Sequence, residues 1–235
     1  HITLHATASI HNESDNYEYV DEEADFTQLF FDNGRYTKAF DGEKVTGNAL
    51  GFGLNKRTRT DNFGFVLRLR SPGFRTSNGF ETNNATKWLK AGRGKTVYYD
   101  NHPKLLKTDY GIETIYKTNY TGLIKKQELS FSTSTDLKKG DFFKFSGEVE
   151  KENFKGYQFD NLYEFEFGYR NQLSSDLKLY NELQSRKIIV RNLDVPQDSG
   201  FYQVKSYVEY RLSEKSNFGV GVSYQKAEDY YDGII

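Results

Sequence analysis

The stretch that decides the fold is Tyr163-Glu164-Phe165-Glu166-Phe167-Gly168-Tyr169-Arg170. Aromatic residues occupy its odd positions, and charged residues with a single glycine occupy its even positions. Because successive side chains of a β-strand point to opposite faces of a sheet, this stretch predicts a strand with one apolar and one charged face. A sheet built from such strands must cover its apolar face with another sheet, with helices or with lipid.

The same alternation recurs through the second half of the chain, in strands that short polar turns separate. Phe143, Phe145 and Val149, for example, alternate with Lys144 and Glu148. Tight turns are expected at residues 57–62, 136–141, 173–176 and 213–217. Longer connections are expected at Ser71–Thr96, Asn153–Asp160 and Arg191–Gly200. Short turns at one end of a sheet and long loops at the other are typical of bacterial outer-membrane barrels.

The first third of the chain is less regular. Residues 2–10 alternate, a weaker strand is expected at Phe26–Phe31, and another contains Tyr110 and Tyr116. The pattern predicts about twelve strands, no helix, and a single β-barrel domain over residues 1–235. The positions of the tight turns leave the last strand running toward the loop side. Either a strand is miscounted in the first third, or one strand is missing at each end and the barrel has fourteen.

Composition argues against several classes of protein. The net charge is −1, from 32 basic and 33 acidic residues, which disfavours nucleic-acid binding by counterion release. Cysteine is absent, so the sequence offers no disulfide, thiolate metal site or cysteine nucleophile. No run approaches the roughly 18 apolar residues of a transmembrane helix. The mean hydropathy of −0.78 is also compatible with a barrel, in which half of each strand faces water.

An enzymatic site is not predicted. The chain contains only four histidines, so few positions could supply a base for a nucleophile. Glu164 and Glu166 lie about 7 Å apart on one strand face, a spacing compatible with a glycosidase pair. Carboxylates two residues apart are, however, very common in strands. We therefore predict no catalytic residue, no metal and no other cofactor.

The charged faces of the strands predict side chains that line a pore and set its ion preference. Alternatively, these side chains form salt-bridged ladders in the wall, or the solvated face of a soluble sheet. Arg68 and Arg70 are adjacent on one face, and the guanidinium fork suits carboxylates, so they are the best candidates to contact an anionic solute. The pore-lining candidates are Arg57, Arg68, Arg70, Lys144, Glu148, Glu164, Glu166, Arg170, Lys178, Glu182, Arg186, Lys205, Glu209 and Arg211.

The expected loop Ser71–Thr96 carries the only tryptophan, Trp88, between Lys87 and Lys90. These three residues are candidates for a constriction inside the pore. The loop could equally project outward as a receptor surface, or lie at the lipid headgroups.

Most of residues 45–228 resembles bacterial outer-membrane porins. The resemblance lies in the strand pattern, in turns such as Arg59-Thr60-Asp61-Asn62-Phe63-Gly64, and in the basic residues Arg68 and Arg70. The closest in style are small monomeric oligosaccharide and acidic-sugar porins and the major porins of fusobacteria. The chain departs from them in lacking the terminal aromatic residue that usually closes such barrels.

This resemblance implies an all-β, antiparallel transmembrane barrel of about twelve to fourteen strands in the bacterial outer membrane, surrounded by its lipid. Its implied function is passive diffusion of small hydrophilic solutes, including anionic ones. Two other hypotheses stay open. One is a surface-display or adhesin barrel whose loops plug the lumen. The other is a soluble, carbohydrate-binding β-sandwich in which the apolar faces pack on each other.

Overall fold

A computed structural model describes residues 1–12, 44–71, 74, 86–120, 122–213 and 216–227. The fold of these residues is all-β, as the alternation predicts. In this part of the chain, no helix is long and apolar enough to cross a membrane. The strands are β1 (Ile2–Asn12), β2 (Lys44–Arg57), β3 (Asp61–Arg70), β4 (Thr86–Tyr98), β5 (Leu105–Asn119), β6 (Ile124–Leu137), β7 (Phe142–Phe154), β8 (Tyr157–Gln172), β9 (Leu177–Val190), β10 (Gln197–Ser213) and β11 (Ser216–Ala227).

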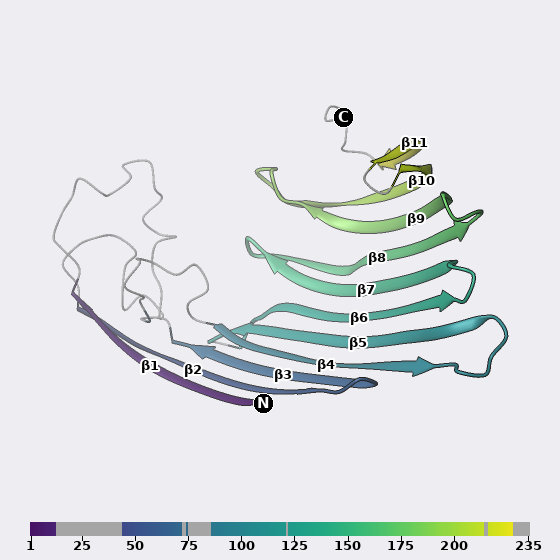
Figure 1. Cartoon of the computed structure of the whole chain (residues 1–235). Helices are drawn as coiled ribbons and strands as arrows, with labels where there is room; N and C mark the ends of the chain where they lie inside the picture. Colours follow the sequence, from purple (N-terminus) through teal and green to yellow (C-terminus); the bar gives the residue numbers. More distant parts are fainter. Residues whose placement is uncertain (13–43, 72–73, 75–85, 121, 214–215, 228–235) are drawn as a thin grey trace. The chain divides into compact units, whose positions relative to one another are not determined.

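These strands form one antiparallel sheet of eleven, in which each strand is hydrogen-bonded to its neighbours in sequence (Figure 1). β1 pairs directly with β2, from Ile2 opposite Leu54 to Asn12 opposite Lys44. The described part of the chain thus contains one strand fewer than the twelve expected. The weak strand expected at Phe26–Phe31 lies outside the described residues.

The chain divides into two compact units. The first contains His1–Asn55, Gly64–Lys90 and Tyr116–Ile124, and the second contains Lys56–Phe63, Ala91–Ile115 and Lys125–Ile235. In the first unit, Leu4 of β1 lies opposite Phe52 of β2. The ring of Phe52 meets that of Phe65 on β3 edge to face, with centroids 6.0 Å apart. Apolar side chains of neighbouring strands therefore gather on one side of the sheet.

Strand register in the second unit also places like residues on like faces. Phe145 of β7 lies opposite Phe167 of β8, which lies opposite Leu183 of β9. One residue away, Glu166 of β8 lies opposite Gln184 of β9. We call the side of Phe167 the apolar face and the side of Glu166 the polar face. The two-faced strand predicted for residues 163–170 is confirmed.

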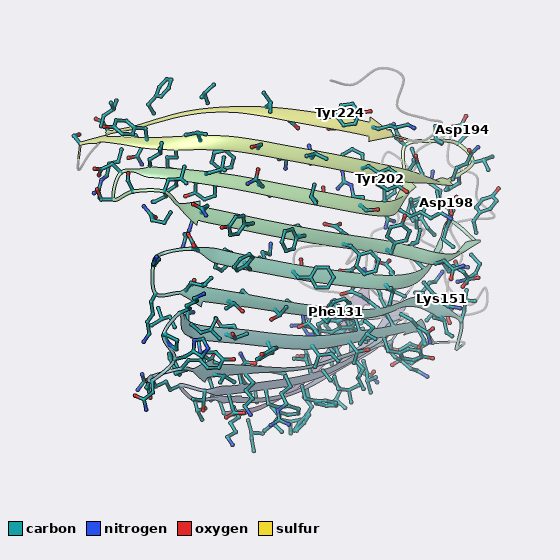
Figure 2. All side chains as sticks on the ribbon, turned by 90° about the vertical axis from the view of Figure 1, so that its right-hand side faces the viewer. Phe131, Lys151, Asp194, Asp198, Tyr202 and Tyr224 are labelled. Atoms are coloured by element: carbon teal, nitrogen blue, oxygen red, sulfur yellow. The ribbon has the colours of Figure 1, made fainter. Side chains whose placement is uncertain are left out.

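Large side chains on the apolar face are exposed rather than covered. Figure 2 labels three of them, Phe131, Tyr202 and Tyr224. Leu183 is 50% exposed and Val222 is 76% exposed. All described strands belong to one sheet, so within the described residues no second sheet covers this face. The buried hydrophobic residues in this part of the chain are Phe74, Phe159, Leu162, Ile189, Val190 and Phe201.

Two connections differ from the prediction. The prediction of a loop at Ser71–Thr96 is wrong for the second part of that segment, because Thr86–Tyr98 is strand β4. The long connection expected at Asn153–Asp160 is also wrong, since only Lys155 and Gly156 join β7 to β8. Their φ angles are 50° and 87°. Two successive positive φ angles give the tight hairpin turn that matches the twist of the strands it joins.

The expected tight turns between β6 and β7 and between β8 and β9 are confirmed. In the first, the N–H of Leu137 donates to the carbonyl of Asp141 at 2.9 Å, and Gly140 has a φ of 90°. In the second, the hydroxyl of Ser174 accepts a hydrogen bond from the N–H of Leu177 at 3.1 Å. The connection expected at Arg191–Gly200 is shorter than predicted, because β10 already begins at Gln197.

Candidate functional site

The polar face of the second unit brings together most of the pore-lining candidates. They lie on the adjacent strands β7, β8, β9 and β10. The register of the β7–β8, β8–β9 and β9–β10 pairs places all of them on the same side of the sheet. The side chains of neighbouring strands therefore meet across the hydrogen-bonded ladder. The candidates on this face are Lys144, Glu148, Glu164, Glu166, Arg170, Lys178, Glu182, Arg186, Lys205, Glu209 and Arg211.

Opposite charges on this face form pairs across neighbouring strands. The ammonium of Lys144 lies 2.8 Å from a carboxylate oxygen of Glu166. Lys205 lies 2.8 Å from Glu182 in the same way. Exposed pairs of this kind contribute only about 0–1 kcal/mol each to stability. Their larger effect is on the net charge of the polar face, because each charge is offset by that of its partner. Lys178 and Glu209 form a further cross-strand pair. Lys126 of β6 pairs with Glu128 on its own strand and with Glu150 on β7, and Arg191, just after β9, pairs with Glu152 of β7.

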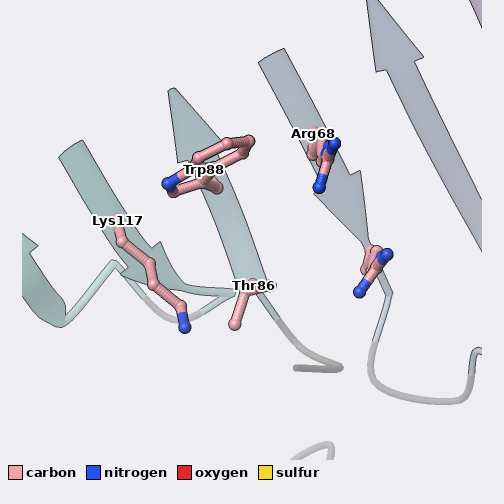
Figure 3. A pocket seen from close by; sticks show the side chains of 5 residues that line it. Arg68, Thr86, Trp88 and Lys117 are labelled. Atoms are coloured by element: carbon pink, nitrogen blue, oxygen red, sulfur yellow. The ribbon is translucent and has the colours of Figure 1, made fainter. Parts of the chain in front are cut away.

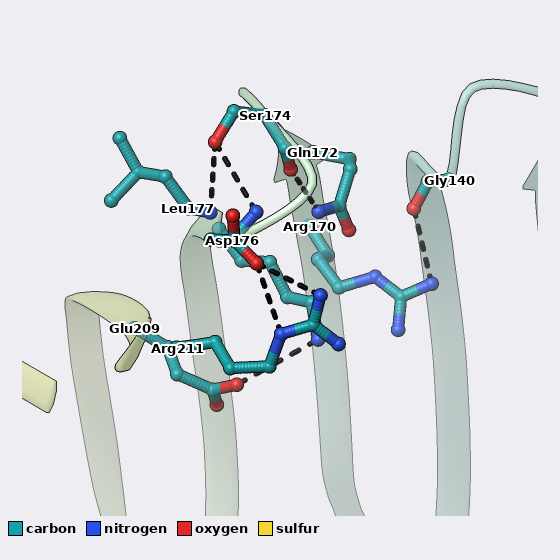
Figure 4. A network of polar contacts seen from close by, with 9 residues as sticks. Gly140, Arg170, Gln172, Ser174, Asp176, Leu177, Glu209 and Arg211 are labelled. Atoms are coloured by element: carbon teal, nitrogen blue, oxygen red, sulfur yellow. Dashed lines mark hydrogen bonds and ion pairs between the residues drawn. The ribbon is translucent and has the colours of Figure 1, made fainter. Parts of the chain in front are cut away.

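A polar network occupies the end of this face near the β8–β9 turn (Figure 4). Arg211 of β10 donates through Nε and Nη2 to one carboxylate oxygen of Asp176, at 3.0 and 2.8 Å. Arg170 of β8 donates to the carbonyl of Gly140 at 3.1 Å. The pKa of the Asp176 carboxyl is held below its usual range, first by the hydrogen bond from Ser175 and then by Arg211. Two of the predicted arginines thus tie turns to strands.

Carboxylates also cluster on β6 and β7. Oxygen atoms of Glu128, Glu148 and Glu150 lie within 4.8 Å of one another, a spacing at which they could hold a metal ion. The ammonium of Lys126 lies 2.9 Å from Glu128 and 3.0 Å from Glu150. A cation of the chain itself thus already lies among these carboxylates.

Two tyrosines interrupt the charged ladder. Tyr180 of β9 and Tyr207 of β10 stack with ring centroids 4.4 Å apart and planes 6° apart. Gly221 of β11 lies opposite Tyr207, where a Cβ would meet the backbone of Ser206 at 2.8 Å. The sequence interpretation did not single out this pair. In the sequence, Tyr207 lies two residues from Lys205 and two from Glu209, at a position where this strand otherwise carries charged side chains. That spacing is the signal that places Tyr207 on the polar face.

The first unit contains a cationic pocket of about 240 Å³ (Figure 3). Its lining comes from three neighbouring strands: Arg68 and Arg70 of β3, Thr86 and Trp88 of β4, and Lys117 of β5. The guanidinium of Arg68 lies over the indole of Trp88, 4.9 Å from the ring centroid. The described lining residues include three cations and no acid, so these five residues together carry a formal charge of +3 at neutral pH.

The pocket contains two of the residues that the sequence singled out, and the structure corrects the placement of three others. Arg68 and Arg70 do line one site, as expected from their spacing. The placement of Lys87, Trp88 and Lys90 in a loop is wrong, because all three belong to strand β4. Trp88 faces the pocket. Lys87 has the opposite parity, and its ammonium lies 5.1 Å from the ring centroid of Tyr120.

Thr86 and Lys117 were missed by the sequence interpretation. Thr86 fell in the segment that was expected to be a loop, and Lys117 lies in the less regular part of the sequence. The alternation of β5 around Tyr116 is the signal that assigns Lys117 to the charged side. Arg57, the remaining pore-lining candidate, ends β2 at the connection to β3.

No family model, no curated protein and no solved structure matches this chain. The features of the chain that bear on its function are therefore the two faces of the sheet and the pocket.

Proposed function

We propose that this chain is a bacterial outer-membrane porin, whose sheet closes as a transmembrane β-barrel and lets small hydrophilic, preferentially anionic, solutes diffuse through a water-filled lumen. The observation that carries the proposal is the two-sided sheet. Its apolar face exposes large side chains, while its polar face is lined by cross-strand ion pairs. Strands that alternate apolar and polar side chains in this way are the pattern of membrane barrels.

Lipid is the cover that best suits the apolar face. Soluble monomers rarely expose contiguous apolar patches larger than a few hundred Å². Here exposed apolar side chains run along successive strands, among them Val149, Phe167, Leu183 and Val204. Closure of the sheet by strand pairing would also satisfy the backbone groups of its edge strands, which lipid leaves without partners.

The polar face supports the choice of solute. Cross-strand pairs such as Lys144–Glu166 offset each other, so they add little net charge to a lumen. The described residues that line the cationic pocket carry a formal charge of +3. Rings and tracks of one sign set the ion preference of a pore. The pocket is therefore the feature expected to favour anions.

Single-channel conductance in a planar bilayer under a salt gradient tests the proposal. The unchanged protein is expected to give stable open steps with an anion-selective reversal potential. Arg68→Gln or Arg70→Gln should shift that potential toward cations, with a fall in the anion-to-cation permeability ratio of roughly twofold or more. The matched control is Lys151→Gln, which removes one positive charge from the apolar face beside Asp160. This control should leave the reversal potential unchanged.

Each contrary outcome would reject a different part of the proposal. Insertion without conductance would overturn the channel and favour a display barrel with a plugged lumen. A protein that stays monomeric without detergent and never inserts would overturn the membrane assignment. Open steps whose selectivity is the same in Arg68→Gln and Lys151→Gln would leave the channel but remove the role of the pocket.

A further inference from the structure

We infer that the apolar face of β8 to β11 crosses a lipid bilayer with its strands tilted by about 40° against the membrane normal. Two rows of aromatic residues on this face lie at the two levels of the lipid headgroups. The inference rests on the proposed function, because it gives the lipid contact of this face a depth and a direction. The first row is Tyr163, Tyr202 and Tyr224, and the second row is Tyr169, Tyr210 and Phe218.

The first row crosses the strands at a slant. Through the β8–β9 and β9–β10 pairs, Tyr202 of β10 is in register with Phe165 of β8, two residues beyond Tyr163. Through the same pairs and the β10–β11 pair, Tyr224 of β11 is in register with Phe167, four residues beyond Tyr163. Between β8 and β11 the first row is therefore displaced by four residues toward the β8–β9 turn.

The second row has the same displacement in the same direction. Tyr169 of β8 is in register with Ser206 of β10, and Tyr210 lies four residues beyond Ser206 on the side of the β8–β9 turn. Phe218 of β11 lies directly opposite Tyr210. The two rows therefore follow parallel lines across the sheet, although the residues that define them belong to different ends of the strands.

This displacement gives the tilt of the strands. Four residues of a strand span about 13 Å, and the three strand spacings from β8 to β11 span about 14 Å. Each row is therefore inclined by about 40° to the direction perpendicular to the strands. Strands of outer-membrane barrels are tilted by roughly 35–45°. Two rows that each lie at one depth in a bilayer would have this slope.

The residue types differ between the rows and the band that the rows enclose. Tyrosine dominates the rows, and its apolar ring with a polar hydroxyl suits the boundary between hydrocarbon and water. Tyr202, Tyr210, Phe218 and Tyr224 are exposed, as a contact with lipid requires (Figure 2). The band contains no charged residue on the apolar face of these described strands, and its few polar residues are uncharged. Its residues are Phe165, Phe167, Leu179, Asn181, Leu183, Ser185, Val204, Ser206, Val208, Val220 and Val222.

Lysines border the first row on the side away from the band. Lys187 of β9 lies opposite Tyr163 of β8, and Lys226 of β11 lies two residues beyond Tyr224. Asp198, the ion-pair partner of Lys187, also lies outside the band. An apolar face that ends in tyrosines and then in charged residues has the order of a strand that leaves hydrocarbon through the headgroups.

Depth measurements on single cysteines test the tilt, because the chain has no cysteine of its own. Phe165 and Lys226 are in register with each other across the sheet, as are Asn171 and Val220. Upright strands would hold both members of each pair at one depth. With the inferred tilt, a label at Phe165 lies deeper than one at Lys226, and a label at Val220 lies deeper than one at Asn171. The difference is roughly 10 Å in each pair.

The experiment uses the full chain in vesicles of dioleoylphosphatidylcholine, with a nitroxide on Phe165→Cys, Lys226→Cys, Asn171→Cys or Val220→Cys. Collisions with oxygen, which concentrates in hydrocarbon, are compared with collisions with a water-soluble nickel chelate. The oxygen-to-nickel ratio should be higher at residues 165 and 220 than at their partners.

Two further sets of variants keep the test decisive. Ser223→Cys is the matched control on the polar face of β11 and should favour the nickel chelate. Phe167→Cys and Val222→Cys also lie in the band, and they replace Phe165→Cys and Val220→Cys if either of those fails to insert.

Three results would overturn the inference. Equal depths within both pairs would remove the tilt, and a reversed order in either pair would remove the rows. Labels in the band that are shielded from both reagents would mean that protein, and not lipid, covers this face. Failure of the channel is distinguishable from all three, because the same depths would then be found in a protein that gives no conductance.

Discussion

Charged residues of the sheet have two kinds of surroundings. On the polar face of the second unit, cations lie against carboxylates of neighbouring strands, as Lys205 does with Glu182. In the first unit, Arg68 and Arg70 line a pocket with Trp88 and with no acid among its described lining residues. Cations of the sheet therefore pair with carboxylates on the polar face of the second unit and line a pocket in the first unit.

Asp176 gives a prediction at the residue scale. Its carboxylate accepts hydrogen bonds from Ser175 and Arg211, and its pKa is lowered in the folded protein. A lowered pKa means that the carboxylate contributes stability above its ordinary pKa of about 3.9, and that this contribution is lost as the pH falls through the folded value. Asp176→Asn should therefore lower the unfolding midpoint at neutral pH, and the difference should shrink below about pH 4.

Unfolding in detergent, followed across pH, measures this difference. Asp194→Asn is the control, because Asp194 is an exposed carboxylate in the β9–β10 connection. It should change the midpoint less than Asp176→Asn at neutral pH. A difference for Asp176→Asn that stays constant into strongly acidic solution would contradict the assignment of the effect to this carboxylate.

At the scale of the element, the β7–β8 hairpin shows how two residues replace an expected loop. Lys155 and Gly156 both have positive φ, the conformation that a two-residue turn of this kind requires. Glycine adopts it without steric cost, whereas a lysine with a Cβ is less suited to it. The turn is therefore held by the pairing of the flanking strands, in which Phe154 lies opposite Tyr157.

Gly156→Ala tests the backbone requirement of this turn. A Cβ at Gly156 would meet nothing within 4 Å, so any loss of stability comes from its φ of 87°. The expected cost is about 1–2 kcal/mol, measured as a lower midpoint in denaturant. Gly64→Ala is the matched control, since its Cβ also has open space but no positive φ is found there. Equal effects of the two substitutions would refute the argument from φ.

At the scale of the whole molecule, the described sheet leaves many large side chains of its apolar face exposed. Val204, Val220 and Tyr224 are 46%, 63% and 65% exposed, although they share the apolar face of adjacent strands. Burial of such surface is the main favourable term in folding and association. The lipid contact proposed for this face would therefore supply apolar contacts that the described sheet does not supply for itself.

A charge on the apolar face is the test of this proposal. Val204→Arg is expected to prevent stable insertion into lipid vesicles, because a cation facing lipid near the membrane midplane costs about 2–4 kcal/mol. Gln203→Arg puts the same charge one residue away, on the polar face, and should insert normally. Vesicle flotation with protease protection distinguishes the two. Equal behaviour of both variants would contradict a lipid-facing side at this strand.

Much of the sheet could be predicted from alternation, and each error has its own physical cause. Residues 163–170 alternate strictly, and the register confirms their two faces. Thr86–Tyr98 has small and polar residues on both faces, including Gly92 and Gly94, so its alternation is weak and it was expected to be a loop. The Lys155-Gly156 turn was missed because bulky residues surround it, and the φ angles that identify it depend on the pairing of the two strands.

The sequence by itself determined that the chain forms two-sided strands, because side-chain alternation is a local property of each strand. It also placed Arg68 and Arg70 on one face, because they lie two residues apart. Only the tertiary structure decided that Trp88 and Lys117 join them in one pocket, and that Lys144 and Glu166 offset each other. Those contacts depend on which strands are neighbours and in which register they pair. Register in turn is fixed by the geometry of the turns and by which face of each strand is apolar, and both act only when whole strands pair.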